Sequence, residues 1–357
     1  MGRKVKEEWI WEALKKAKHP ETGKSLVELG MIRDVKVKGG RVRLTVALPF
    51  KNVPVKDQIV ENARKAVEGV EGVEEVEVEL VEMTPRERSR FMEVQEGRTG
   101  AAKGMNEIDR VIAVMSGKGG VGKSLVAGLL AVELRRKGFK VGVLDADITG
   151  PSIPKMFLPF PKRPEVGPQN AVIPVETDLL GIKLISINLF LPSEDEAVIW
   201  RGPLIGNAIK QFWDEVLWGE LDYLIVDLPP GTSDAPLTVM QALPLTGVVL
   251  VTSPQELAGM VVRKAARMAQ RLNVPLLGLV ENMSYVVCPK CGERIEIFGP
   301  SRASAIANAF DIPFLGRLPI DPTITRLCDE GWIEKYPSEK FGHIVEELLK
   351  SIERLEG

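Results

Sequence analysis

The sequence predicts an α/β protein in which a mostly parallel sheet is covered by helices on both faces and is preceded by a small α/β domain. From residue 110 onward, short apolar runs of the buried-strand type alternate with helical segments, which is typical of a parallel sheet. A glycine-rich loop joins the first of these runs to a helix. Before residue 83 the pattern is instead a hairpin with one helix on either side.

The composition is that of an ordinary globular protein of about two domains. Of the 357 residues, 45% are hydrophobic and 27% are charged. The formal net charge of -2 argues against a dedicated nucleic-acid binder. No apolar run reaches the length of a membrane span, and the charged N-terminus does not resemble a secretory signal. Because three cysteines cannot form a disulfide framework, we expect a cytoplasmic protein.

Residues 1–83 are expected to form the small α/β domain, and the charged stretch 84–107, which lacks apolar periodicity, is interpreted as a linker. Gly39 lies at the centre of the predicted hairpin. The predicted elements are a helix at 9–17, strands at 34–38 and 41–48, a helix at 59–67 and a strand at 73–80.

Residues 108–357 are expected to form the second domain. Its first helix, at 124–137, is predicted to end at Gly138. The predicted strands are 110–115, 141–144, 184–188, 223–226, 248–252 and 276–281.

The glycine-rich loop fits the phosphate-binding pattern G-x-x-x-x-G-K-[ST] between a strand and a helix, which predicts a P-loop NTPase. Glycines allow successive backbone N–H groups to wrap the phosphates, and the helix N-terminus adds its dipole. Lys123 would reach the β- and γ-phosphates of ATP, and the Ser124 hydroxyl would hold Mg²⁺. The predicted nucleotide-binding residues of the loop are Gly117, Lys118, Gly119, Gly120, Val121, Gly122, Lys123 and Ser124.

Carboxylates follow two of the predicted strands. Asp145 and Asp147 come after the second strand, and Asp227 after the fourth. An isolated aspartate at a strand end is more often a helix cap. Beside a P-loop, however, these positions lie on the edge of the sheet where α/β folds bind ligands. Asp227 would therefore hold Mg²⁺.

Cys288 and Cys291 form a C-x-x-C pair in a loop. Two thiolates supply half of a four-coordinate metal site, so a symmetric dimer would complete either a [4Fe–4S] cluster or a zinc site. A redox pair is disfavoured because that motif opens a helix, and a buried structural pair because Pro289 and Gly292 are loop residues. Cys328 stands alone and is interpreted as a packing residue.

The run Lys-Gly-Gly-Val-Gly-Lys-Ser at 118–124 resembles the deviant Walker A loop of the MinD, ParA and nitrogenase iron-protein group of ATPases. The resemblance implies that Lys118 crosses a dimer interface to contact the nucleotide of the partner subunit. It also implies that Asp145 and Asp147 belong to switch I, with Asp147 positioning the attacking water, and that 229–231 is switch II. We therefore expect Lys118, Lys123 and Asp147 to be catalytic.

Residues from about 110 to 325 resemble the Mrp/ApbC/NBP-type iron–sulfur cluster carrier ATPases. The resemblance implies a slow, dimerisation-dependent ATP hydrolase that holds a labile [4Fe–4S] cluster between the cysteine pairs of two copies. It also implies that apo iron–sulfur client proteins and assembly factors are partners, and that Asn282 and Asp321 contact the adenine. The motifs that carry it are 118–124, Asp145 to Ser152, Val198 to Pro203, Asp227 to Asp234, and Asn282 to Ser284 with the two cysteines.

Residues 22–82 resemble the small domain that is fused ahead of many of these ATPases and is related to iron–sulfur targeting factors. Related domains carry a cysteine before a proline where this chain has Val53-Pro54. We therefore expect this domain to dock other proteins rather than to bind metal.

Two alternatives remain. The first is a MinD- or ParA-like positioning ATPase, for which the amphipathic C-terminal segment 341–357 would bind membrane. Its polar face is rich in glutamate, which anionic lipid would repel, so we expect no membrane partner and a helix packed on its own domain. ParA-like DNA binding would need basic clusters that are absent, so no nucleic-acid partner is expected. The second is a zinc-stapled dimer that ATP switches without carrying a cluster.

Overall fold

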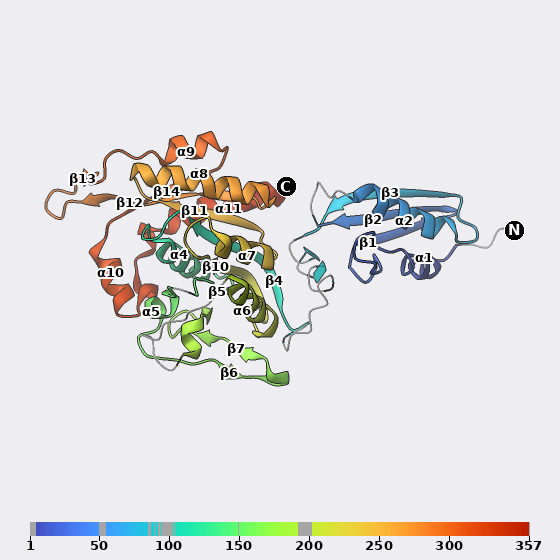
Figure 1. Ribbon diagram of the computed structural model, residues 1–357, viewed down its shortest axis with the longest axis horizontal. Helices are drawn as coiled ribbons and strands as arrows, with labels where there is room; N and C mark the ends of the chain where they lie inside the picture. The colour runs from blue at the N-terminus through green and yellow to red at the C-terminus, as the bar shows by residue number, and fades with distance from the viewer. Residues whose placement is uncertain are drawn as a thin grey trace. The chain divides into compact units, whose positions relative to one another are not determined.

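A computed structural model describes residues 5–49, 55–84, 87–88, 90–91, 94, 102, 104–148, 150–191 and 202–356. The chain divides into two compact units, Met1–Thr99 and Gly100–Gly357 (Figure 1). The residues 198–201 of one family motif, Val53-Pro54 and most of the predicted linker 84–107 lie outside the described residues.

The first unit is a three-stranded sheet with order β1-β2-β3, where β1 and β2 are antiparallel and β2 and β3 are parallel. The predicted hairpin is confirmed, and Gly39 takes the left-handed conformation (φ 68°) at its turn. The first helix ends three residues earlier than the predicted position 17, at Leu14, although Ala17 is buried. The elements are α1 (Glu7–Leu14), β1 (Ile32–Lys38), β2 (Arg41–Leu48), α2 (Lys56–Glu68) and β3 (Glu75–Glu82).

The second unit is built on a sheet with the order β13-β12-β11-β4-β10-β5-β9-β8, to which β14 adds by pairing with β12. The pairs from β14 through β9 are parallel, and only β12–β13 and β8–β9 among the described pairs of this sheet are antiparallel. This confirms the predicted mostly parallel sheet. The strands are β4 (Glu107–Ser116), β5 (Val141–Asp145), β8 (Val175–Glu176), β9 (Lys183–Ile185), β10 (Glu220–Asp227), β11 (Gly247–Thr252), β12 (Leu276–Val287), β13 (Arg294–Ile295) and β14 (Phe314–Pro319).

Helices cover both faces of this sheet, as predicted. One hydrophobic core contains buried residues of α4, α5, α10 and α11, and the other contains buried residues of α6, α7, α8 and α9. The helices are α4 (Lys123–Arg136), α5 (Ile153–Phe157), α6 (Gly202–Glu215), α7 (Asp234–Ala242), α8 (Glu256–Arg271), α9 (Ala303–Ala309), α10 (Pro322–Asp329) and α11 (Gly342–Glu356).

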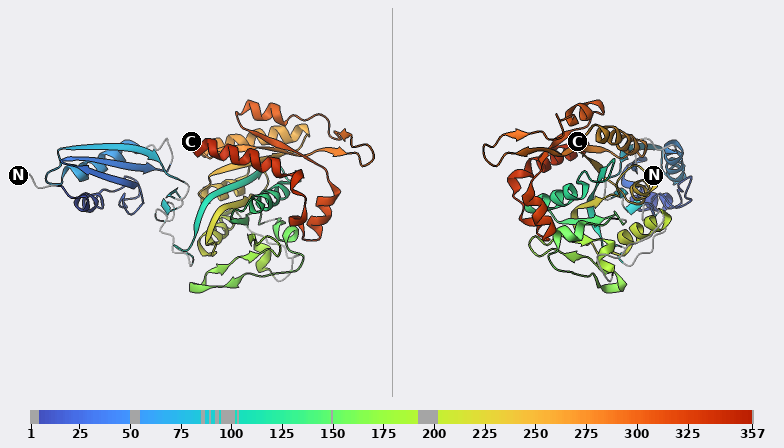
Figure 2. Two further views of the ribbon diagram at one scale, coloured as in Figure 1. Left: turned by 180° about the vertical axis from the view of Figure 1, so that it is seen from behind. Right: turned by 60° about the vertical axis from the view of Figure 1, so that its left-hand side comes forward.

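The C-terminal helix α11, drawn in red, packs within the second unit against β12, β14 and α4 (Figure 2). Its apolar side chains Ile344, Val345, Leu348 and Ile352 are buried in the same core as α4. The predicted packing of this helix on its own domain is therefore confirmed. No helix in the described part of the chain is long and apolar enough to cross a membrane.

In the second unit, three further features differ from the sequence prediction. The strand predicted at 184–188 ends at Ile185, and a short 3-10 helix, Ile187–Phe190, follows it. β12 continues to Val287 instead of ending at 281. The short strands β6 (Glu165–Val166), β7 (Val172–Ile173), β8 and β13, and the longer β14, were not predicted. β6, β7, β8 and β13 have only two residues each, too few for an alternating pattern to be recognised, and β14 forms by pairing with β12.

Candidate functional site

The P-loop leaves the carboxyl end of β4 and leads into α4, whose first residue is Lys123. Gly120 and Gly122 both have a φ of 79°, a left-handed conformation that side chains other than glycine rarely adopt. The loop therefore has the backbone that its glycines predict, and it places the helix N-terminus where phosphate would bind.

Asn282, in the middle of β12, packs directly on this loop. Its Nδ2 donates a hydrogen bond to the Val121 carbonyl at 3.0 Å, and the side chain is buried. A Cβ atom built on Gly122 would lie 2.1 Å from the same Nδ2. Gly122 is thus required both for its backbone angle and for the closeness of Asn282. The adenine contact expected for Asn282 stays a prediction.

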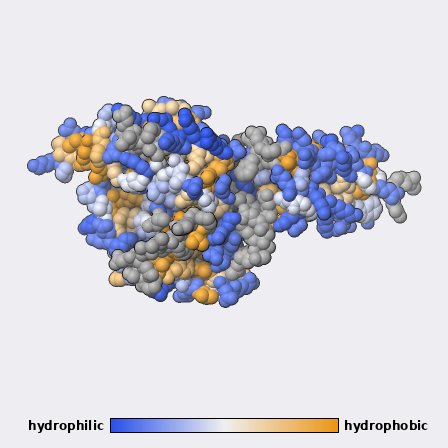
Figure 3. All heavy atoms as spheres, in the orientation of Figure 1, coloured by the Kyte–Doolittle hydropathy of each residue, from blue (hydrophilic) through white to orange (hydrophobic). Residues whose placement is uncertain are grey.

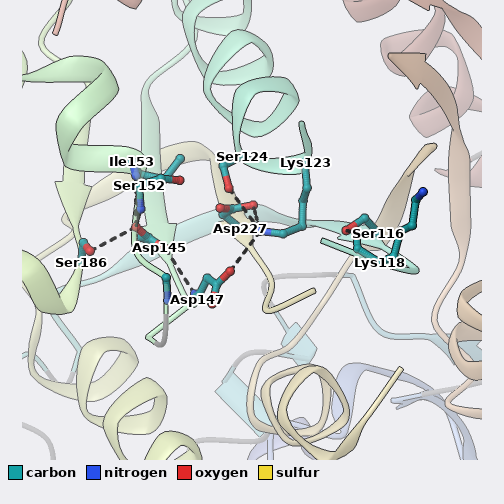
Figure 4. A network of polar contacts seen from close by, with 11 residues as sticks. Ser116, Lys118, Lys123, Ser124, Asp145, Asp147, Ser152, Ile153, Ser186 and Asp227 are labelled. Carbon is teal, nitrogen blue, oxygen red and sulfur yellow. Dashed lines mark hydrogen bonds and ion pairs between the residues drawn. The ribbon is translucent and has the colours of Figure 1, made fainter. Parts of the chain in front are cut away.

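Lys123 interacts with two of the carboxylates that were predicted at the ends of the strands. Its Nζ donates to Asp227 Oδ1 at 2.5 Å and lies 4.0 Å from Asp147 Oδ2. Figure 4 shows the Lys123 ammonium pointing toward both carboxylates. Ser124 Oγ lies 3.3 Å from the same ammonium. All four side chains come together because β4, β5 and β10 are neighbours, with Asp227 beside Asp145 in register.

Asp145 organises the loop that follows β5. Its carboxylate accepts hydrogen bonds from the backbone N–H groups of Asp147, Ser152 and Ile153 and from the Ser186 hydroxyl. Burial, together with the nearby Asp227 charge, raises the pKa of Asp145 to about 8. No sequence pattern pointed to Ser186, which follows β9 and lies far from Asp145 along the chain.

The cluster has the donors that a divalent cation needs. Among the described residues, Asp227 Oδ2 is buried without a hydrogen-bond partner. Three buried carboxylates, Asp145, Asp147 and Asp227, surround the single ammonium of Lys123. Burial also raises the pKa of Asp227. A cation such as Mg²⁺ would relieve this excess of negative charge, so the residues fit the predicted ion.

Lys118 points away from this cluster (Figure 4). Its Nζ donates to Gln255 Oε1 at 2.6 Å, at the start of α8, on the exposed surface. The predicted contact of Lys118 with nucleotide in a second copy stays a prediction. Gln255 was not singled out in the sequence.

The two cysteines lie on a hairpin that continues β12 and returns as β13. The Cys288 N–H donates to the Glu293 carbonyl, and the Gly292 N–H donates to the Cys288 carbonyl. Both thiols are free, Cys288 half-buried and Cys291 exposed. The N–H groups of Cys291 and Lys290 lower the pKa of the Cys288 thiol. Among the described residues of this single chain, no third His, Cys, Asp or Glu is grouped with the two cysteines as a metal ligand, so each chain offers a pair of thiols at the hairpin.

The two remaining candidates have structural contacts. Cys328 packs at the edge of the main core, and burial raises the pKa of its thiol to about 11. Asp321 caps α10 by accepting the Thr323 N–H at 2.9 Å, and it also accepts hydrogen bonds from Tyr336 and Lys340. Its expected contact with adenine stays a prediction.

Comparison with known proteins gives matches in both units. Residues 107–353 match the family described as NUBPL iron-transfer P-loop NTPase, and residues 7–80 match the family described as iron-sulfur cluster assembly protein. A protein of Clostridium perfringens named iron-sulfur cluster carrier protein is 46% identical over 238 residues, which cover 65% of this chain and 83% of that protein. A protein of the same name from Synechocystis sp. is 41% identical over 326 residues, 90% of this chain and 89% of that one.

A solved structure supports the same assignment. It is described as the nucleotide-binding protein from Archaeoglobus fulgidus in complex with ADP, with Co found in it. It is 48% identical to this chain, covers 66% of it and 91% of the other, and has a TM-score of 0.59. The family match spans well over half of the chain and contains the P-loop, the strand-end aspartates and the cysteine hairpin. The chain therefore belongs to the NUBPL iron-transfer P-loop NTPase family.

Proposed function

We propose that this protein is an ATP-dependent iron–sulfur cluster carrier that works as a homodimer in the cytoplasm, where thiols stay reduced. The observation that carries the proposal is the pair of free thiols, half-buried Cys288 and exposed Cys291, just after a strand whose Asn282 also contacts the P-loop. Relatives named iron-sulfur cluster carrier protein, which this chain matches over most of their length, support it.

The P-loop residues 117–124 would bind the phosphates of ATP, with Lys123 on the β- and γ-phosphates. Ser124 and Asp227 would hold Mg²⁺, which when bound neutralises charge on the phosphates. Asp147 would orient the attacking water, and Lys118 of a second copy would add a cation to the site. Because the catalytic set is complete only in the dimer, hydrolysis would be slow and dependent on dimerisation.

The cluster is the cargo. Two thiolates from each of two copies related by a two-fold axis supply the four ligands of a [4Fe–4S] cluster. Apolar side chains are exposed on the hairpin and just after it, and Figure 3 shows apolar surface at this end of the second unit. Burying them against a second copy would stabilise the dimer. They are Val287, Ile295, Ile297 and Phe298.

The domain division 1–83, 84–107 and 108–357 belongs to the same proposal. The first domain would dock apo iron–sulfur client proteins or assembly factors, while the second binds ATP and the cluster. The positioning function of a MinD-like protein is not favoured, because the apolar face of α11 is buried in the core and is not free to enter a membrane.

The test is a metal count. The protein is purified without oxygen and reconstituted with iron and sulfide, and iron, labile sulfide and zinc are measured per dimer. We expect about four iron and four sulfide ions per dimer, lost in Cys288→Ala and Cys291→Ala but retained in the control Cys328→Ala. Tightly bound zinc without labile sulfide would contradict the carrier function and indicate the zinc-stapled ATP switch.

A further inference from the structure

The pairing of β12 with its neighbours is irregular at several places, and the largest irregularity lies between Glu281 and Tyr285. The pairing of β12 with β14 runs from Glu281 opposite Arg317 to Tyr285 opposite Pro319, so β12 has extra residues in this interval. Met283, in the middle of it, has a φ of 56°. A bulge of this kind re-aims the side chains on either side of it, and strained backbone persists where the surrounding structure holds it. Residues 282–284 are called the β12 bulge below.

On the N-terminal side, the bulge faces the nucleotide site. Asn282 donates to the Val121 carbonyl and fits closely over Gly122, as described above. Any movement of the P-loop backbone on binding phosphate must therefore be accommodated by Asn282, because no free space separates them.

On the C-terminal side, the bulge faces Arg317 of β14. The Arg317 Nε donates to Ser284 Oγ at 2.5 Å and lies 3.5 Å from Glu281 Oε2. Ser284 in turn donates to the Glu281 carboxylate, and both side chains are buried. A buried carboxylate paired in this way holds its partners in place, because losing the guanidinium would leave its charge uncompensated.

The same arginine reaches the cysteine hairpin. Its Nη2 forms an ion pair with Glu296, which follows β13. The Arg317 guanidinium lies 5.4 Å from the centre of the Tyr285 ring, and that of Arg294, on β13 itself, lies 4.7 Å from it. Arg317 thus contacts Ser284 in the bulge on one side, and Tyr285 of β12 and Glu296 just after β13 on the other.

We infer that the β12 bulge ties the P-loop to the cysteine hairpin, with Asn282 and Arg317 as the positioning residues at its two ends. When nucleotide binds in the P-loop, Asn282 moves, and Ser284 at the other end of the bulge moves with it. Arg317, which is hydrogen-bonded to Ser284, then changes the position of Glu296 and the hairpin. This inference rests on the proposed function and adds the route by which its two sites communicate. Such coupling is reciprocal, so metal on the cysteines must change nucleotide affinity by the same factor.

The test uses the full chain, free of metal, and two probes: Mg·ADP, and Co²⁺, whose thiolate complexes absorb in the near ultraviolet. Co²⁺ affinity is measured from this absorption with and without saturating Mg·ADP, and Mg·ADP affinity is measured calorimetrically with and without Co²⁺. For the unmodified chain we expect each affinity to change by the same factor, roughly fivefold or more.

The informative variant is Glu296→Gln, which removes the ion pair between Arg317 and Glu296 and leaves the buried Arg317–Glu281 pair intact. Arg317→Lys is the second, because it keeps the charge beside Glu281 but loses the donor to Ser284. The matched control is Glu293→Gln, which removes the same charge from the same hairpin, where only the Glu293 backbone carbonyl has a described role.

We expect the coupling factor to fall below about twofold in Glu296→Gln and Arg317→Lys and to stay unchanged in the control. An unchanged factor in both variants, or equal Co²⁺ affinities with and without Mg·ADP in the unmodified chain, would overturn this route while leaving the proposed function standing. Failure of the unmodified chain to bind Mg·ADP or Co²⁺ at all would contradict the proposed function, and the route with it.

Discussion

The contact between Asn282 and Gly122 joins two segments that are far apart in the sequence. A glycine is needed at position 122 because any Cβ there would meet the Asn282 amide, whereas at Gly120, with the same φ, a Cβ would meet nothing within 4 Å. Two neighbouring glycines of one loop are therefore required for different reasons: backbone angle alone at Gly120, and backbone angle plus the closeness of another strand at Gly122.

Gly122→Ala and Gly120→Ala should each lose about 1–3 kcal/mol of unfolding free energy from backbone strain. Gly122→Ala should lose additional unfolding free energy because the new methyl group displaces Asn282, and Gly120→Ala should not. Combining Gly122→Ala with Asn282→Ala should therefore recover part of that additional loss. Denaturant unfolding of the single and double variants measures this. We expect a coupling of at least about 1 kcal/mol between positions 122 and 282, and one within about 0.5 kcal/mol for 120 and 282. Equal couplings would contradict this account of Gly122.

We expect the stability of the first unit to depend on pH because of His19. Burial lowers the pKa of its imidazole, and Nδ1 accepts the Glu21 N–H. Below its ordinary pKa of about 6.5, the unfolded chain takes up a proton that the folded chain resists. Stability therefore falls as the pH decreases from about 6.5 toward the lowered pKa. Protonation would also abolish the acceptor at Nδ1.

Hydrogen exchange of β1 and β2 amides at pH 7.5 and 5.5, with rates corrected for intrinsic exchange, checks this. We expect protection to decrease at the lower pH in the unmodified chain, and to change less in His19→Asn, which keeps an acceptor but does not titrate. The control is His343→Asn, because His343 is exposed on α11. An identical pH response in His19→Asn would show that His19 is not the titrating group.

At the scale of single elements, β12 shows what the sequence could and could not predict. Its apolar beginning predicted a buried strand, and that part pairs with β11. The bulge at Met283 and the continuation into the hairpin depend on pairing with β14 and β13, which the sequence pattern does not encode. The prediction that Lys123, Asp147 and Asp227 lie close together was correct, because the carboxyl ends of neighbouring parallel strands meet at one edge of the sheet. It could not show that Asn282 contacts the Val121 carbonyl or that Asp321 caps α10.

The helix α11 allows a matched test of its packing. Leu348 is fully buried, while Leu355 on the same helix is 52% exposed. Leu348→Ala should lower the free energy of unfolding by about 2–5 kcal/mol because it leaves a cavity in the core. Leu355→Ala should change it by no more than about 0.5 kcal/mol. Denaturant midpoints measure both, and similar losses would contradict the packing of this face on the sheet.

At the scale of the whole molecule, the chain combines a nucleotide site and a thiol pair within its second unit and carries a separate small α/β unit. The mostly parallel sheet with helices on both faces was predictable because each buried strand and its helix are local patterns. The short strands at the edges of the sheet were not, since they form only by pairing. Under the proposed function, a second copy would complete both sites, because one chain supplies two thiols and holds its Lys118 on Gln255.

The most direct measurement of the carrier function is the transfer of a cluster. The reconstituted protein is mixed with an apo-enzyme that needs a [4Fe–4S] cluster, with and without Mg·ATP and in the presence of a chelator that removes free iron. Recovery of acceptor activity is measured over time. The account predicts recovery from the unmodified chain and from Cys328→Ala, and none from Cys288→Ala or Cys291→Ala. A loaded protein that retains its cluster, or that restores activity only when the chelator is left out, would contradict it.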